Sequence, residues 1–531
     1  MNMKNIFSVI IILFLFLGCK EYENPYAIIT KSEKFDFWHL KGFNTDSIPG
    51  ISLNKAYKTF LKSKKGNDVI VAVIDTDINT THEDLKNNIW INDAEISKNG
   101  IDDDKNGYVD DVNGWNFLRK HSGERIIYNN YSHIHILRKY NSLYKGKTIE
   151  EVGVDTINFT LYQRALKYHE TLKKRIKSNY DQAKFLINAY PIGKKAMDSL
   201  FKKSDYTIEE MDSVYFVYEK TNPTLANNAA FMYDYIKYDM DGFAEELLAD
   251  TKATEEIVNN INVNPKTNND HILFGSPIIN QDLDKLTHGT SVTGVISANR
   301  INNIGAVGIT NNVKIMTVSI QAKIGADNDN DLASAIRYAV DNGAKIINYS
   351  AVTDFSINHE LVQEALKYAE EKDVLFIRAA GNSSQNLDSI HKYPNNKYNL
   401  SNFLIVSAVN NTLDSNFKPI WANYGGKTVD LFAPGVDIPT TRSNGNYYLD
   451  TGTSMATPLV VGVAALIKAY YPSLTMIEIK DIILQTVSTY DVDIIIKNKP
   501  KKLIPFSNLS KSGGVLNAYN AIELAEEKAT N

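Results

Sequence analysis

The sequence predicts an α/β fold with a doubly wound, mostly parallel sheet and a mainly helical insertion. Apolar runs of strand length occur at residues 68–75, 313–319, 345–350, 374–378 and 403–408. The runs are continuous rather than alternating, which indicates strands buried on both faces, as in parallel sheets. Helical patterns at residues 332–342 and 361–372 lie between the later runs, and this alternation favours crossover connections. Functional residues are therefore expected after the carboxyl ends of the strands.

Residues 119–269 interrupt the alternation of strands and helices. One helical face is formed by side chains at three- and four-residue spacing: Leu161, Ala165, Tyr168, Leu172 and Ile176. Residues 225–248 and 253–261 also have helical patterns. Three prolines are expected to separate the helices of this segment: Pro191, Pro223 and Pro265. We therefore expect one domain at residues 66–118 and 270–531, with a helical insertion at residues 119–269.

The composition is that of an ordinary globular protein. Hydrophobic residues make up 43% of the 531-residue chain, which excludes a mainly disordered or fibrous architecture. The 57 Lys and Arg residues are balanced by 62 Asp and Glu residues, so the net charge of -5 gives no overall attraction for nucleic acid. The single cysteine, Cys19, excludes an intramolecular disulfide.

Residues 1–18 have the features of a signal for export. A basic residue precedes the apolar stretch Ile6–Leu17, which is too short to span a bilayer. A small residue and then Cys19 follow, and this order resembles the lipobox of bacterial lipoproteins, with an aromatic residue at the usually aliphatic position. The resemblance implies lipidation of Cys19 and an exported cell-envelope lipoprotein at the outer membrane or the cell surface. The alternative is an ordinary signal peptide. Residues 19–65 are expected to form an N-terminal arm or spacer.

Four residues in separate segments are suited to nucleophilic catalysis. Asp75 ends the first apolar run, where a carboxylate can orient an imidazole and stabilise its cation. His288 begins a helical segment of small residues, and Ser454 begins an apolar helix. The N-terminus of that helix offers free N–H groups and a positive dipole end to a developing anion. Asn382 follows a further strand and can donate a hydrogen bond to the same anion.

The segments VIDTD (73–77), HGTSVTGV (288–295) and GTSMATP (452–458) together resemble the motifs of subtilisin-like serine proteases, the subtilase family or peptidase S8. The order Asp, His, Ser along the chain is that of the family. The resemblance implies a serine endopeptidase that hydrolyses peptide or protein substrates through an acyl-enzyme and requires no cofactor for this chemistry.

The resemblance also assigns individual roles. Asp75 would orient the imidazole, His288 would act as base and then as acid, and Ser454 would attack the scissile carbonyl. Asn382 and the backbone N–H of Ser454 would hold the oxyanion. The substrate would bind along four further residues: Ser350, Ala351, Val352 and Gly381.

Two positions depart from the family pattern. The family's Asp-Ser/Thr-Gly is Asp75-Thr76-Asp77 here, so that a carboxylate replaces glycine. The family's Ser-x-Gly is Ser350-Ala351-Val352, so that a branched side chain replaces glycine in the substrate cleft. Neither departure removes a reacting group. They leave open a second interpretation, a catalytically inactive surface binding protein with the subtilase fold.

An acidic loop predicts a structural calcium site. Residues 102–111 place oxygen-bearing side chains at loop positions 1, 3, 5 and 9, with glycine at position 6. The candidate ligands are Asp102, Asp104, Asn106 and Asp110. Position 12 is Asn113 rather than a bidentate Glu. The alternative is therefore a solvated acidic turn without a metal.

Overall fold

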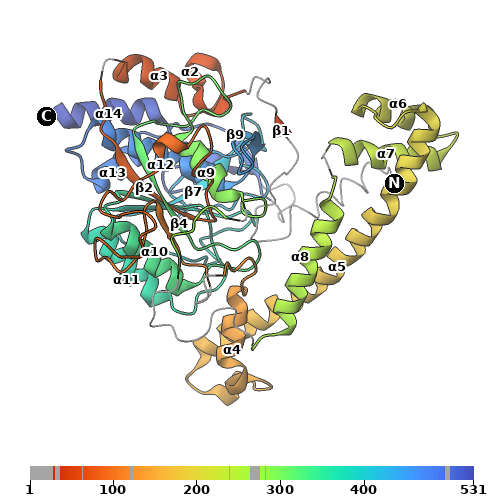
Figure 1. Ribbon diagram of the computed structural model, residues 1–531, viewed down its shortest axis with the longest axis horizontal. Coiled ribbons are helices and arrows are strands. Elements are labelled where there is room, and N and C mark those ends of the chain that lie inside the picture. Colours follow the sequence, from red (N-terminus) through yellow and green to blue (C-terminus); the bar gives the residue numbers. More distant parts are fainter. Residues whose placement is uncertain are drawn as a thin grey trace. The chain divides into compact units, whose positions relative to one another are not determined.

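The structure is a computed structural model that describes residues 28–29, 36–62, 64–119, 124–237, 240–262, 275–281, 283–496 and 503–530 (Figure 1). The contacts divide the chain into two compact units. The first unit includes Ile29–Ser132 and Pro265–Asn531, and the second is mainly His133–Asn264. The first unit contains all the residues to which the family resemblance assigns a role.

A seven-stranded parallel sheet forms the centre of the first unit, as the sequence predicts. The strand order is β3-β4-β2-β5-β6-β7-β8, and every neighbouring pair is parallel. The strands are β2 (Val69–Asp75), β3 (Gly114–Asn116), β4 (Val313–Ser319), β5 (Ile346–Tyr349), β6 (Leu375–Ala379), β7 (Phe403–Val409) and β8 (Leu431–Pro434). The edge strands β3 and β8, of 3 and 4 residues, are not predicted from the sequence.

Helices cover both faces of the sheet, because alternate residues of each strand point to opposite sides (Figure 1). In β2, Val71 and Val73 belong to one hydrophobic core, whereas Ala72 and Ile74 belong to the other. The first core includes α9 (His288–Ser297), α12 (Thr453–Tyr470), α13 (Met476–Gln485) and α14 (Ala518–Thr530). The second core includes α10 (Asp329–Asp341) and α11 (His359–Glu371). These three layers confirm the predicted doubly wound α/β fold.

The helix α12 is long and apolar. Among the described residues, it alone has the length and composition that would allow a helix to cross a membrane. Its side chains from Thr453 to Ile467 are buried. It packs on β5, β6, β7 and β8 and beside α9. In the structure it is thus the central helix of the first core.

Two antiparallel hairpins complete the first unit. They are formed by β9 (Ile438–Thr441) with β10 (Tyr447–Asp450), and by β11 (Asp493–Ile495) with β12 (Leu503–Pro505). The first hairpin holds α9, because the hydroxyl of Thr440 donates to the carbonyl of Ser291 at 2.5 Å. The other short elements of the chain are β1 (Ile28–Ile29), η3 (Lys86–Asn88) and η5 (Phe506–Asn508).

The described N-terminal residues 36–62 belong to the first core. They contain η1 (Trp38–Leu40), α2 (Phe43–Asp46), α3 (Leu53–Ala56) and the π-helical turn η2 (Tyr57–Leu61). Trp38 and Leu61 are each 3% exposed, and their side chains lie in the same core as α12. The Trp38 indole donates to the carbonyl of Val436 at 3.0 Å. The arm or spacer expected at residues 19–65 is therefore corrected for this part, which apolar side chains fix to the core.

The second unit is helical in its described residues. It consists of α4 (Ser132–Tyr144), η4 (Glu150–Val152), α5 (Thr156–Phe201), α6 (Ile208–Tyr218), α7 (Pro223–Lys237) and α8 (Phe243–Asn259). The long helix α5 packs against α7 and α8. The segment before it belongs with the first unit, because Asn129 donates its N–H to the carbonyl of Ile324 at 2.7 Å. The second unit thus begins at His133, later than the expected limit at Arg119.

Two helix boundaries in this unit differ from the expectation. Pro191 lies inside α5, which continues for 46 residues. Tertiary packing of α5 therefore outweighs the hydrogen bond that this proline removes. The helix expected at residues 225–248 is divided into α7 and α8 by a turn at residues 241–242. Pro223 is the first residue of α7, where a missing N–H costs little. Pro265 lies outside the described residues.

We predict that Trp38→Ala destabilises the first unit. The substitution removes a buried indole and leaves a cavity, and such changes cost about 3–5 kcal/mol. The midpoint of denaturant unfolding, followed by tryptophan-independent far-UV circular dichroism, measures the loss. Phe43→Ala is the control from the same segment, because its ring is 43% exposed. Equal and small effects of both substitutions would contradict a core role for residues 36–62.

Candidate active site

Asp75 and His288 form a hydrogen-bonded pair at the carboxyl edge of the sheet. Nδ1 of His288 lies 2.8 Å from Oδ1 and 2.9 Å from Oδ2 of Asp75. Asp75 is fully buried, and the imidazole is 15% exposed. The backbone N–H of Thr76 also donates to Asp75 Oδ1 at 2.7 Å. The carboxylate therefore fixes the orientation of the ring, and Nε2 becomes the nitrogen that a reacting group would meet.

Local sequence brings the two residues together. Asp75 is the last residue of β2, and His288 is the first residue of α9. The hydroxyl of Thr76 accepts the N–H of Gly289 at 2.8 Å. A Cβ atom at Gly289 would lie 2.6 Å from the carbonyl oxygen of Thr76, so that only glycine permits this approach. The small residue after His288 thus allows α9 to begin directly beside the end of β2.

Ser454 lies at the N-terminus of α12, beside the end of β5. It is the second residue of the helix and is 1% exposed. Pro458 has no N–H to donate to the carbonyl of Ser454, four residues earlier. The hydroxyl of Ser350 supplies the missing donor at 3.0 Å. The family resemblance assigns Ser350 only to substrate binding, whereas in the structure its hydroxyl also holds the backbone of Ser454.

Asn382 follows β6 and is oriented by Thr453. Its Oδ1 accepts the N–H of Thr453 at 3.1 Å and the hydroxyl of Thr453 at 2.9 Å. A backbone N–H is always a donor, so this contact fixes which end of the amide is oxygen. The Nδ2 donors of Asn382 are therefore directed away from Thr453. This is the orientation that an oxyanion donor beside Ser454 requires.

Asn423 holds the loop that contains Asn382. Its N–H donates to the carbonyl of Gly381 at 3.0 Å, and its Nδ2 donates to that of Ala380 at 2.8 Å. Its Oδ1 accepts the N–H groups of Ser383 and Gln385 at 3.1 and 2.8 Å. Neither Asn423 nor Thr453 is predicted as a site residue from the sequence. The position of Thr453 inside the serine motif was the available signal, and Asn423 has none in a single sequence.

The Asp75–His288 pair and the pair of Ser454 and Asn382 lie on one side of the sheet. The helices α9 and α12 pack against each other within the first core. His288 and Ser454 stand at the N-termini of these neighbouring helices. The arrangement provides an oriented imidazole, a hydroxyl at a helix N-terminus and an amide donor. These are the components of nucleophilic acyl transfer.

The expected substrate edges face each other closely. Ser350, Ala351 and Val352 directly follow β5, and Gly381 follows β6. Gly381 has φ of 95°, in the left-handed region that favours glycine. A Cβ atom at Gly381 would lie 2.7 Å from Cγ1 of Val352. The side chain of Val352 therefore occupies the space between the two edges.

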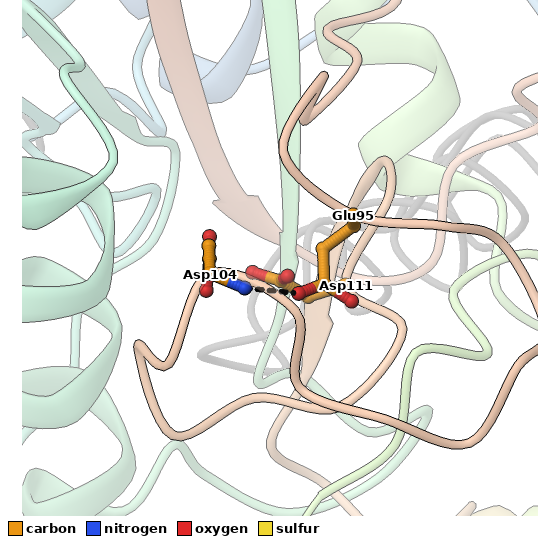
Figure 2. Close-up of side chains that lie close together, drawn as sticks. All are labelled: Glu95, Asp104 and Asp111. Carbon is orange, nitrogen blue, oxygen red and sulfur yellow. Dashed lines mark hydrogen bonds between the residues drawn. The ribbon is translucent and has the colours of Figure 1, made fainter.

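The acidic loop brings together a different set of carboxylates from the one expected. Oxygen atoms of Glu95, Asp104 and Asp111 lie within 4.8 Å of one another (Figure 2). Asp111 is fully buried, and this burial raises the pKa of its carboxyl group. The hydroxyl of Tyr338 donates to Asp111 at 2.6 Å and opposes this rise in pKa. Clustered hard oxygens of this kind are the ligands that calcium prefers.

Of the four predicted ligands, Asp104 alone belongs to this cluster. The carboxylate of Asp102 accepts the N–H groups of Asn106 and Gly107 at 3.1 and 2.9 Å. The carboxylate of Asp110 accepts two backbone N–H groups of residues 99–100. Asn106 donates its Nδ2 to Asp104 and to Asp111, at 3.1 Å in each case. The carboxylates of Asp102 and Asp110 thus cap turns of the loop and lie outside the cluster of three, and their assignment as ligands stays a prediction. Calcium binding itself stays a prediction. The remaining candidate, Cys19, lies outside the described residues.

Known proteins resemble the chain in this same region. A family model described as the subtilase family matches residues 66–519. The chain is 36% identical over 208 residues to the cell wall-associated protease of Bacillus subtilis strain 168. The matched region covers 39% of the chain and 22% of that protein. It is 34% identical over 220 residues to the thermophilic serine proteinase of Bacillus sp. strain AK1, covering 40% of the chain and 51% of that protein. The matches therefore span about half or less of these relatives.

Among solved structures, the chain is similar to the prenylagaramide maturation protease PagA. The identity is 26%, the TM-score is 0.37, and the match covers 46% of the chain and 83% of that structure. A cold adapted subtilisin-like serine proteinase matches with 25% identity and a TM-score of 0.35, over 44% of the chain and 74% of that structure. The family assignment rests on the family model, which matches most of the chain and contains the Asp, His and Ser motifs. The chain belongs to the subtilase family of serine proteases.

Proposed function

We propose that the chain is an exported serine endopeptidase that hydrolyses peptide bonds with Asp75, His288 and Ser454. The observation that carries the proposal is the hydrogen bond between His288 Nδ1 and the buried Asp75 carboxylate. It supports a tautomer with the proton on Nδ1, which leaves Nε2 as the base. Membership of the subtilase family supports the same reaction class.

The reaction proceeds in two halves. Nε2 of His288 takes the proton of the Ser454 hydroxyl as Oγ attacks the scissile carbonyl. Asn382 Nδ2 and the Ser454 N–H donate to the oxyanion, and Asp75 stabilises the imidazolium. The proton on Nε2 then passes to the leaving amine, and an acyl-enzyme forms on Ser454. Water, activated by the same nitrogen, releases the acid and restores the hydroxyl.

We also propose export and a lipid anchor at Cys19. The apolar stretch Ile6–Leu17 followed by a small residue and cysteine supports this part of the proposal. It is argued from the sequence, since residues 1–27 lie outside the described residues.

Ser454→Ala is expected to lower the kcat for peptide hydrolysis by about 10⁶-fold, because the nucleophile is removed while the fold tolerates the smaller side chain. Fluorophosphonate labelling of the purified protein, with mass mapping of the modified peptide, measures the reactive hydroxyl directly. Ser510→Ala is the control, a serine that is also buried, at 3% exposure. A folded wild-type protein that neither labels nor cleaves any peptide of a library would instead support the inactive binding protein.

Val352→Gly is expected to raise the preference for aromatic residues immediately before the scissile bond. Removing the isopropyl group opens the space beside Gly381, and a few methylene groups shift relative kcat/KM by about 10–100-fold. Competing peptides with Phe, Ala or Val at that position provide the measurement. Ala351→Gly is the control on the same edge, because its side chain packs against the second core. A wild-type enzyme that already prefers Phe would show that Val352 does not limit this pocket.

Calcium removal is expected to lower the melting temperature. A ligand that binds only the native state at about 100 times its Kd adds about 2.7 kcal/mol, or roughly 3–4 °C for a domain of this size. Scanning calorimetry with calcium and with a chelator tests this. Asp104→Ala should remove the difference, whereas the exposed neighbour Asp93→Ala should retain it. An unchanged melting temperature in the wild type would identify the loop as an acidic turn without a metal.

Cys19→Ser is expected to move the protein from the membrane fraction to a soluble fraction. The thioether bond to lipid requires the thiol, and an acyl chain contributes about 0.8 kcal/mol of membrane binding per buried CH₂. Fractionation after washing with high salt, together with metabolic labelling by a fatty-acid analogue, provides the readout. If the variant stays in the membrane fraction and the wild type takes up no label, the lipoprotein assignment is wrong.

A further inference from the structure

Asp77, the carboxylate that replaces the family's glycine, is fully buried and ion-paired. Its Oδ1 lies 2.7 Å from Arg125 Nη1. The hydroxyl of Ser319 and Nδ2 of Asn116 also donate to Oδ1, at 2.6 and 3.2 Å. The N–H of Gln281 donates to Oδ2 at 3.2 Å. Both oxygens are thus satisfied by groups from four separate segments of the first unit.

Three of these partners come from the two ends of the segment that separates the Asp and His motifs, and Ser319 comes from the end of β4. Arg125 precedes the second unit in sequence, and Gln281 follows it. The two ends also pair directly, because the N–H of Asn116 donates to the carbonyl of Ser276 at 2.9 Å. The guanidinium of Arg119 donates to Gln281 Oε1 at 3.0 Å. Asp77 therefore lies where the chain leaves the first unit and returns to it.

The same contacts reach the backbone of Asp75. The carbonyl of Asp75 accepts the N–H groups of Ile320 and Gln321, at 3.0 and 3.2 Å. Nη2 of Arg125 donates to the carbonyl of Gln321 at 3.2 Å. On the other side, Thr76 links Asp75 to Asp77 and donates its N–H to the Asp75 carboxylate. The Asp77–Arg125 pair thus holds the peptide group that follows Asp75, the residue that orients His288.

Electrostatics makes this pair sensitive to the loss of one partner. Burial raises the pKa of Asp77, and the charge of Arg125 opposes this effect. Removing one member leaves the other as an uncompensated buried charge, whereas removing both does not. A double substitution is therefore expected to be less harmful than the loss of Arg125 alone.

We propose that Asp77 is a positioning residue that fixes both ends of the inserted segment to the Asp75 loop and so holds Asp75 in register with His288. The proposal rests on the proposed protease function. Asp77 contacts no reacting atom. It acts on Asp75 through Thr76, and through Arg125, which binds the carbonyl of Gln321.

Kinetics on a small peptide substrate tests the effect on the site. Arg125→Met is expected to lower kcat by about 10–100-fold with KM within threefold, because small misplacements of catalytic groups have effects of this size. The double variant Asp77→Asn/Arg125→Met should recover at least tenfold of that loss. Asp430→Asn is the matched control, since Asp430 is also buried and pairs with Lys511 at 2.8 Å beside the edge strand β8. An unchanged kcat, a fall equal to that of Asp430→Asn, or no recovery in the double variant would overturn the proposal.

Hydrogen exchange tests, without using activity, whether Asp77 joins the two ends of the inserted segment. In a Ser454→Ala background, Asp77→Asn is expected to raise amide exchange in residues 114–119, 124–130 and 275–281 together, and to leave β6 and β7 unchanged. No increase, or an increase at one end alone, would contradict the role of Asp77 in joining the two ends. This measurement separates the positioning role of Asp77 from the proposed protease function, because it gives the same answer whether or not the wild-type protein cleaves peptides.

Discussion

The buried carboxylate of Asp75 is the group around which the first unit is organised. A charge at the end of a strand, out of contact with water, is stable only if donors surround it. The N–H of Thr76 and Nδ1 of His288 fulfil this requirement, and each contact fixes an element. One sets the path of the chain beyond β2, and the other sets where α9 begins. The close approach at Gly289 and the hairpin that holds α9 follow from the same requirement.

The second half of the site depends on backbone groups that the helix α12 leaves without partners inside itself. The free N–H of Thr453 meets Oδ1 of Asn382, and the carbonyl of Ser454 meets the hydroxyl of Ser350. Both partners come from loops that follow parallel strands. The carboxyl edge of the sheet therefore brings together the groups that a helix N-terminus requires, and the same contacts orient the amide of Asn382.

Sequence patterns predicted the interior of the fold and the residues that we propose to react, and they failed where partners are distant in sequence. Long apolar runs identified β2 and β4, and short motifs identified Asp75, His288 and Ser454. The edge strand β3 is too short for such a pattern, and packing of the second unit overrides the break expected at Pro191. Spacing alone suggested Asp102 as a ligand. The grouping of Asp104 with Glu95 and Asp111 depends instead on how the chain folds, because Glu95 precedes the acidic loop and no spacing within that loop indicates it.

The carbonyl of Ser454, to which Pro458 cannot donate a hydrogen bond, has a consequence for redesign of the proposed substrate cleft. A library that varies Ser350, Ala351 and Val352 together treats three unequal positions as equal. The hydroxyl of Ser350 donates to a backbone carbonyl of helix α12, whereas the side chain of Val352 fills space beside Gly381. Diversity at Ala351 and Val352 therefore explores specificity, while diversity at Ser350 mostly produces proteins with a buried carbonyl that lacks a donor. A productive library keeps the serine and randomises the two residues after it.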